Sequence, residues 1–74
     1  MMNVYFAVLR MKASEPKYGA QVVVLDEFPE TPPSSPLINK GDVITLFSND
    51  GMYRAARNSE GKRVYISVFS EVEL

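Results

Sequence analysis

The chain has 74 residues, a formal net charge of -1, 46% hydrophobic residues, and no Cys or His. The absence of Cys and His removes disulfides, thiolate metal sites and the usual general base, so the composition argues against an enzyme and against a metal or cofactor. The small net charge gives no overall attraction to nucleic acid or to an anionic membrane. We therefore expect one domain over residues 1–74, located in the cytoplasm, with no catalytic residues.

The first two predicted strands cover residues 2–11 and 20–27. The run Val4–Leu9 is apolar on both alternating faces, which is typical of an interior strand. It is too short to span a membrane, and no Lys or Arg precedes it as in a signal peptide. Three consecutive valines within residues 20–27 also favour a sheet. Because Pro16 and Gly19 indicate a turn between the two runs, we predict that these strands form a hairpin.

Residues 28–36, which we name the proline segment, contain four prolines. Proline lacks a backbone N–H donor and fixes φ, so the segment cannot be a helix or a central strand. We interpret it as a stiff surface loop whose prolines lower the entropy of the unfolded chain. Its two PxxP spacings, Pro29–Pro32 and Pro33–Pro36, leave open the alternative that it is a built-in ligand for a domain that recognises proline-rich peptides.

Three further strands are predicted at residues 42–48, 53–58 and 62–69. In the first of them, alternation places Ile44 and Leu46 in the core. Residues that tolerate positive φ occupy the two gaps between these strands, which is typical of hairpin turns. The chain is therefore predicted to be all-β, with five antiparallel strands.

The second half of the chain resembles a Src-homology-3 domain over residues 40–66. The turn Lys40–Asp42 leads into an alternating strand, Asn49–Gly51 precedes a pair of large side chains, and Ala56–Lys62 is similar to the Ala-Arg-Asn strand and distal turn of that family. Val72–Leu74 is similar to its closing strand. The resemblance implies a small five-stranded antiparallel barrel with an enlarged early loop that carries the proline segment.

The sequence departs from this family at the peptide groove. Met52 and Tyr53 stand where the family has paired tryptophans, and Ser67–Glu71 replaces Pro-Ser-Asn-Tyr. Proline-rich peptides dock on ridged aromatic surfaces, so the resemblance implies the fold without the family's peptide specificity. The extra residue in the pair Ala55-Ala56 would reverse the facing of the strand, so we predict a β-bulge there.

The resemblance implies a binding surface between the early loop, the Asn49–Gly51 turn and the side chains that follow it. Acidic residues at the start of the early loop are expected to receive a cation of the partner, whereas neighbours on a strand point to opposite faces and make a poor general acid and base pair. The predicted protein-binding residues are Asp26, Glu27, Glu30, Asn49, Asp50, Met52, Tyr53 and Phe69.

The last predicted hairpin holds half of the chain's basic residues, interleaved with aromatic ones. Such a pattern suits single-stranded nucleic acid, because rings stack on bases and cations follow the backbone. The simpler interpretation is a solvated or protein-binding patch. The residues of the nucleic-acid alternative are Arg54, Arg57, Lys62, Arg63 and Tyr65.

These observations favour a non-catalytic protein-interaction module that occupies the surface of a partner protein. It would be an adaptor or a small inhibitor such as bacteriophages make against host enzymes. A single-stranded nucleic-acid-binding barrel is the alternative. The apolar N-terminal strand also suggests a homodimer formed by pairing of exposed edges, and no membrane partner is expected.

Overall fold

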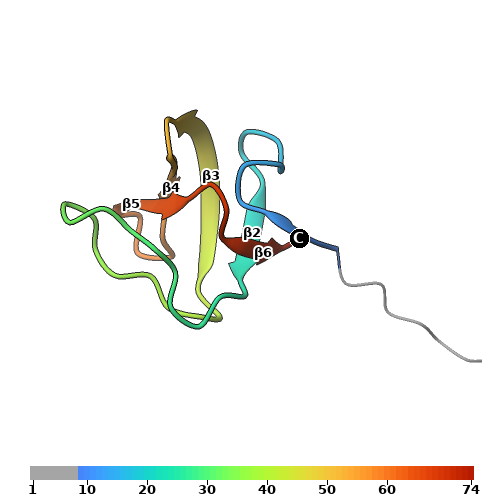
Figure 1. The fold of residues 1–74 in the computed structure, drawn as a ribbon, viewed down its shortest axis with the longest axis horizontal. Coiled ribbons are helices and arrows are strands. Elements are labelled where there is room, and N and C mark those ends of the chain that lie inside the picture. The colour runs from blue at the N-terminus through green and yellow to red at the C-terminus, as the bar shows by residue number, and fades with distance from the viewer. Residues whose placement is uncertain (1–8) are drawn as a thin grey trace, which may run out of the picture.

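The computed structural model describes residues 9–74, in which six strands form one antiparallel sheet (Figure 1). The order of the strands across the sheet is β1-β6-β2-β3-β4-β5. The predicted all-β, antiparallel fold is confirmed, and the part of the chain that the structure describes contains no helix long and apolar enough to cross a membrane. The strands are β1 (Arg10–Lys12), β2 (Gln21–Val24), β3 (Val43–Asp50), β4 (Tyr53–Arg57), β5 (Arg63–Ser67) and β6 (Glu71–Glu73).

The predicted hairpin between the first two strands is wrong. Met11 of β1 pairs with Val72 of β6, and Val24 of β2 pairs with the same residue from the other side. The C-terminal strand therefore lies between the two N-terminal ones, where the side chain of Val72 is fully buried. Of the strand predicted over residues 2–11, the part from residue 2 to residue 8 lies outside the described residues.

Strands β3, β4 and β5 lie where the sequence predicts them and form a meander joined by tight turns. Gly51 and Gly61, in the two turns, have positive φ values of 63° and 79°, which non-glycine residues rarely adopt. Ile44 and Leu46 are at most 1% exposed, as predicted. The core consists of aliphatic side chains from five strands and from loops: Ala13, Val22, Val24, Ile38, Ile44, Leu46, Ala56, Val64, Ile66 and Val72.

A register shift interrupts the pairing of β3 with β4 next to the predicted position. Leu46 pairs with Ala56 and Asn49 with Arg54, so three steps along β3 match two steps along β4. The irregularity therefore lies opposite Ala55, as expected, but the extra residue belongs to β3. A bulge leaves one residue out of the ladder, and here the Phe47 carbonyl accepts a hydrogen bond from Arg54 Nε.

The proline segment covers the outer edge of β5. An edge strand presents unpaired N–H groups, and two of them find partners in this segment. The backbone N–H of Tyr65 donates to Ser35 Oγ at 3.0 Å, and that of Ser67 donates to the carbonyl of Glu30 at 2.9 Å. In Figure 1 the segment, in green, runs beside β5. Since β1 ends the sheet on the other side, the sheet is barrel-like but not closed by pairing of its edges.

Candidate functional site

The solvent-facing side of β3, β4 and β5 brings aromatic and basic side chains together. On β4, Arg54 and Ala56 are buried, so the alternating residues point outward. Val64 and Ile66 are buried in the same way on β5. We name this surface the outer face; its residues include Phe47, Tyr53, Ala55, Arg57, Arg63 and Tyr65.

A pocket of about 320 Å³ lies where the outer face meets the proline segment. The rings of Tyr53 and Tyr65 and the ring of Pro32 supply apolar contact, while Asp50 and Ser34 supply polar groups. We name it the tyrosine pocket. An extended peptide segment suits such walls, because flat rings offer contact area and a carboxylate can receive a Lys or Arg. Two predicted protein-binding residues, Asp50 and Tyr53, lie in it.

Three other predicted residues lie outside the tyrosine pocket. Met52 is 62% exposed at the β3–β4 turn, and its carbonyl accepts a hydrogen bond from the Val68 N–H at 3.0 Å. Phe69, which follows Val68 in the chain, is 61% exposed. The Lys12 ammonium group lies over its ring, 5.6 Å from the ring centre. Asn49 is exposed on β3. Met52 and Phe69 therefore add exposed apolar surface near the β3–β4 turn.

The predicted acidic rim is not at the pocket. Asp26 Oδ2 accepts the backbone N–H of Glu71 at 3.2 Å, so its carboxylate ties the early loop to β6. Glu27 forms a 3.9 Å ion pair with Lys40, and the carbonyl of Glu30 is used at the β5 edge. None of these three residues lines the tyrosine pocket, where the acidic group is Asp50.

Arg54 is a structural residue, and its place among the nucleic-acid-binding candidates is wrong. Its side chain is 3% exposed, and its Nε donates to the Phe47 carbonyl at 2.8 Å. Its Nη1 donates to the carbonyls of Ala13, at 3.1 Å, and Pro16. Burial lowers the pKa of Arg54, because removal from water disfavours the charged form. A nucleic acid cannot reach a guanidinium group held in this way.

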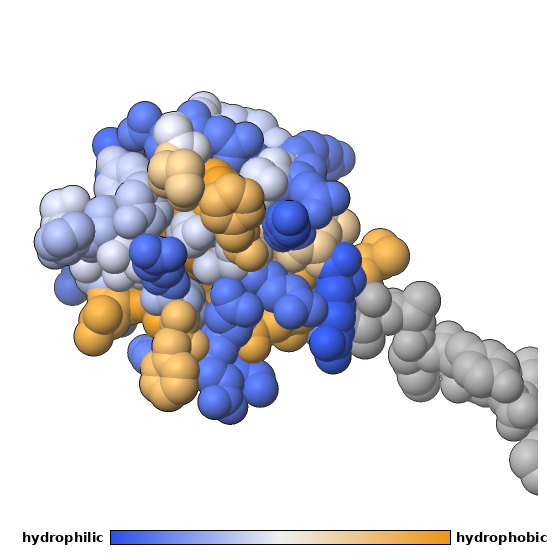
Figure 2. Space-filling model, viewed as in Figure 1, coloured by the Kyte–Doolittle hydropathy of each residue, from blue (hydrophilic) through white to orange (hydrophobic). Residues whose placement is uncertain are grey.

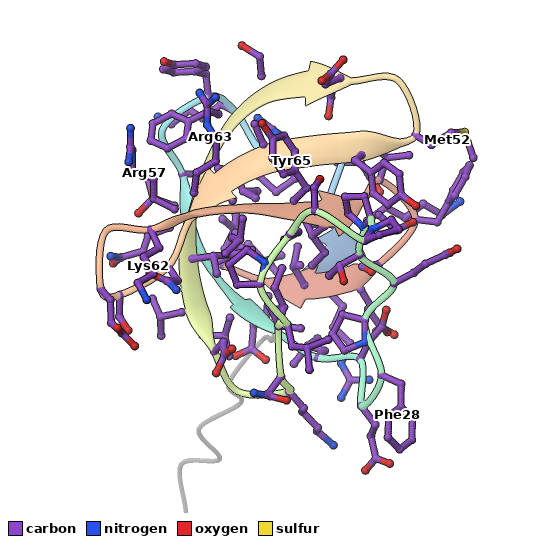
Figure 3. All side chains as sticks on the ribbon, turned by 90° about the vertical axis from the view of Figure 1, so that its left-hand side faces the viewer. Phe28, Met52, Arg57, Lys62, Arg63 and Tyr65 are labelled. Carbon is purple, nitrogen blue, oxygen red and sulfur yellow. The ribbon has the colours of Figure 1, made fainter. Side chains whose placement is uncertain are left out.

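The other candidates of the basic hairpin do share a region of the surface. Figure 3 shows Arg57 and Arg63 at one end of the outer face, Tyr65 nearer its middle, Lys62 at the β4–β5 turn and Met52 at the opposite end. All three basic residues are exposed.

A second hollow, of about 240 Å³, lies at the arginine end of the outer face. Tyr18 and Phe47 meet there edge to face, with ring centres 5.5 Å apart. The Arg57 guanidinium lies 5.9 Å from the centre of the Phe47 ring. We name it the arginine hollow; it is lined by Tyr18, Phe47, Ser48, Ala55, Arg57 and Arg63.

Sequence reasoning missed both rings of the arginine hollow. Phe47 could have been found, because alternation from Leu46 places it on the outward side of β3. Tyr18 lies in the loop between β1 and β2, which has no periodicity to indicate its direction. Only the folding of that loop toward β3, through the Gly19 N–H and the Leu46 carbonyl at 2.7 Å, places it there.

A third hollow, of about 290 Å³, lies beside β1 and β6 and is lined by Arg10, Met11, Lys12, Glu15, Phe69 and Glu71. On the side seen in Figure 2, apolar side chains lie in separate groups between polar ones. Within residues 9–74, no group of three or more Asp or Glu side chains is arranged to hold a metal ion. Comparison with protein-family models, with curated proteins and with solved structures gives no match.

Proposed function

We propose that the chain is a non-catalytic protein-interaction domain that binds an extended segment of a partner protein in the tyrosine pocket. The observation that carries the proposal is the meeting of Tyr53, Tyr65 and Asp50 with Pro32 around one pocket of about 320 Å³. Tyrosine supplies large, rigid contact area at a low entropic cost, which is why it is enriched at protein interfaces.

Asp50 gives the pocket its polarity. It lies at the end of β3 and is exposed, and it makes no ion pair within the described residues. A partner that places a Lys or Arg beside Asp50, and apolar side chains against the two tyrosines, would match both features of the pocket. Exposed Met52 and Phe69 would extend the contact beyond it.

The resemblance of residues 40–66 to Src-homology-3 domains supports this proposal, because domains of that type bind extended peptide segments. We propose that the sheet is a variant of that barrel, in which the tyrosine pocket replaces the tryptophan-lined groove. An adaptor, or a small inhibitor of the kind made by bacteriophages, acting in the cytoplasm, is the role we propose for such a domain. Pairing of two copies through a sheet edge would use β1, since the proline segment already covers β5.

The proposal is tested by capture of partners from nuclease-treated lysate on the immobilised protein, followed by quantification of each captured protein. Tyr53→Ala and Asp50→Asn are expected to lower the recovery of a stoichiometric partner about tenfold or more, as buried interface anchors do. The matched control is Glu60→Gln, which removes the same charge from the exposed β4–β5 turn.

A specific result requires that the two pocket variants lose a partner that the wild type and Glu60→Gln both retain. If every captured protein is recovered equally by all four proteins, the tyrosine pocket is not the binding site. If Tyr53→Ala and Asp50→Asn lose only material that is captured from untreated lysate and is absent after nuclease treatment, the tyrosine pocket holds a nucleic acid and the proposal is wrong.

A further inference from the structure

We propose that the arginine hollow binds single-stranded nucleic acid, with a phosphate between Arg57 and Arg63 and a base against Phe47 and Tyr18. The arginine hollow adjoins the tyrosine pocket but shares no lining residue with it, and the inference does not rest on the protein-binding proposal. It also differs from the basic hairpin predicted from sequence, because it excludes Arg54 and includes Tyr18 and Phe47, which come from the β1–β2 loop and from β3.

The charge of the hollow points to an anionic ligand. Arg57 and Arg63 lie directly opposite each other on β4 and β5, and like charges in that position repel unless an anion lies between them. Neither forms an ion pair within residues 9–74, and residues 1–8 contain no Asp or Glu. A phosphate bound between the two guanidinium groups would relieve their repulsion, and this favours binding.

One of the two arginines is already held in position. Nη1 of Arg57 donates to the Gly61 carbonyl at 2.9 Å, and its guanidinium group lies over Phe47. A guanidinium fixed in this way loses less side-chain entropy when it binds a phosphate. Its remaining N–H groups stay available, because a guanidinium carries five donors.

The rings distinguish nucleic acid from an acidic peptide. Tyr18 is 67% exposed and meets Phe47 edge to face, so at least one ring face is open to solvent beside the two cations. Ala55 also lines the hollow, and its small side chain occupies little of the space. A carboxylate would use only the arginines, whereas a nucleotide uses the arginines for its phosphate and the rings for its base.

A following nucleotide would meet a second platform. Ala55 pairs directly with Tyr65 on β5, so the arginine hollow adjoins the phenol ring that borders the tyrosine pocket. From the two arginines at one end, Tyr65 and then Tyr53 follow along the outer face and offer rings on which successive bases could stack. This arrangement binds strands by stacking and charge and predicts little sequence preference.

The test is fluorescence anisotropy of a labelled oligothymidylate of about 12 nucleotides, titrated with the full chain at several salt concentrations. Arg57→Gln combined with Arg63→Gln removes the contact to the one phosphate between them, so it should lower the slope of log affinity against log salt by about 0.7, the contribution of each phosphate contact to a single strand. The matched control is Arg10→Gln combined with Lys40→Gln, which removes the same charge from exposed residues outside the hollow.

The aromatic part is tested separately. Phe47→Leu keeps apolar volume but removes the ring, so we expect about a tenfold loss of affinity with the salt slope unchanged. Tyr18→Leu tests the contribution of the second ring to base stacking. Tyr18 is exposed in a loop, so this change should affect folding less than Phe47→Leu does. Circular dichroism of each variant confirms that it is folded.

Three results would overturn the proposal. The first is that the wild type binds no oligonucleotide at low salt. The second is that both double variants lose equal affinity, which would show attraction to positive charge in general. The third is that a polyglutamate peptide competes as well as the oligonucleotide while both leucine variants bind normally. That last result would assign the hollow to an acidic protein segment.

Discussion

Replacing Arg54 by methionine is expected to lower the free energy of unfolding by about 3 kcal/mol. The arginine joins two parts of the chain that are far apart in sequence. It connects the loop after β1, through the carbonyls of Ala13 and Pro16, to the irregular part of β3, through the carbonyl of Phe47. Methionine keeps the length and much of the volume of the side chain but donates no hydrogen bond.

The magnitude follows from these three carbonyls. A buried carbonyl left without a donor costs about 1–3 kcal/mol, so three of them cost about 3–9 kcal/mol. The variant also recovers the cost of keeping a guanidinium group away from water, which amounts to several kcal/mol and lowers the net loss. A chain of this size is stable by only about 4–11 kcal/mol, so a net loss of about 3 kcal/mol is large.

The loss should not vary across the neutral pH range. Burial lowers the pKa of Arg54, so the desolvation cost is present at every pH below that pKa. Because the folded state releases this proton before the unfolded state does, stability would rise only as the pH passes through the folded pKa. Arginine stays protonated far above neutral pH, so that change lies in the strongly alkaline range.

Urea denaturation followed by far-ultraviolet circular dichroism measures the effect, since the chain has no Trp. Arg63→Met is the control, because Arg63 is exposed on the adjacent strand and its replacement should cost less than about 0.5 kcal/mol. A loss below about 1 kcal/mol for Arg54→Met, or an equal loss for the control, would refute the reasoning.

Two further changes test the edge cover and the core. Ser35→Ala removes the acceptor of the Tyr65 N–H, so it should lower the free energy of unfolding by about 1 kcal/mol in urea denaturation and increase self-association in size-exclusion chromatography. Ser34→Ala, at an exposed position, should do neither. A Ser35→Ala variant that stays monomeric with unchanged stability would contradict the role of the proline segment. Leu46→Ala, at a fully buried position, should lower the free energy of unfolding by about 2–5 kcal/mol. Val43→Ala, on the exposed side of the same strand, should lower it by less than about 1 kcal/mol. Equal losses would show that the core is assigned wrongly.

The sequence by itself determined the second half of the sheet, because the signals there are local. Alternation along β3 placed Ile44 and Leu46 in the core, and the residues at Gly51 and Gly61 marked turns that need positive φ. Each of these features depends on neighbours within a few residues, so no knowledge of distant pairing was needed.

Only the tertiary structure decided which segments meet. The C-terminal strand enters between β1 and β2, and this reflects pairing across most of the chain, which periodicity does not encode. Alternation places Arg54 and Arg57 on opposite faces of β4, but only the packing of the sheet decides that Arg54 is the one that faces the core. The candidate surfaces depend on the same kind of contact, since Tyr18 and Pro32 come from loops whose direction is set by the strands they cover.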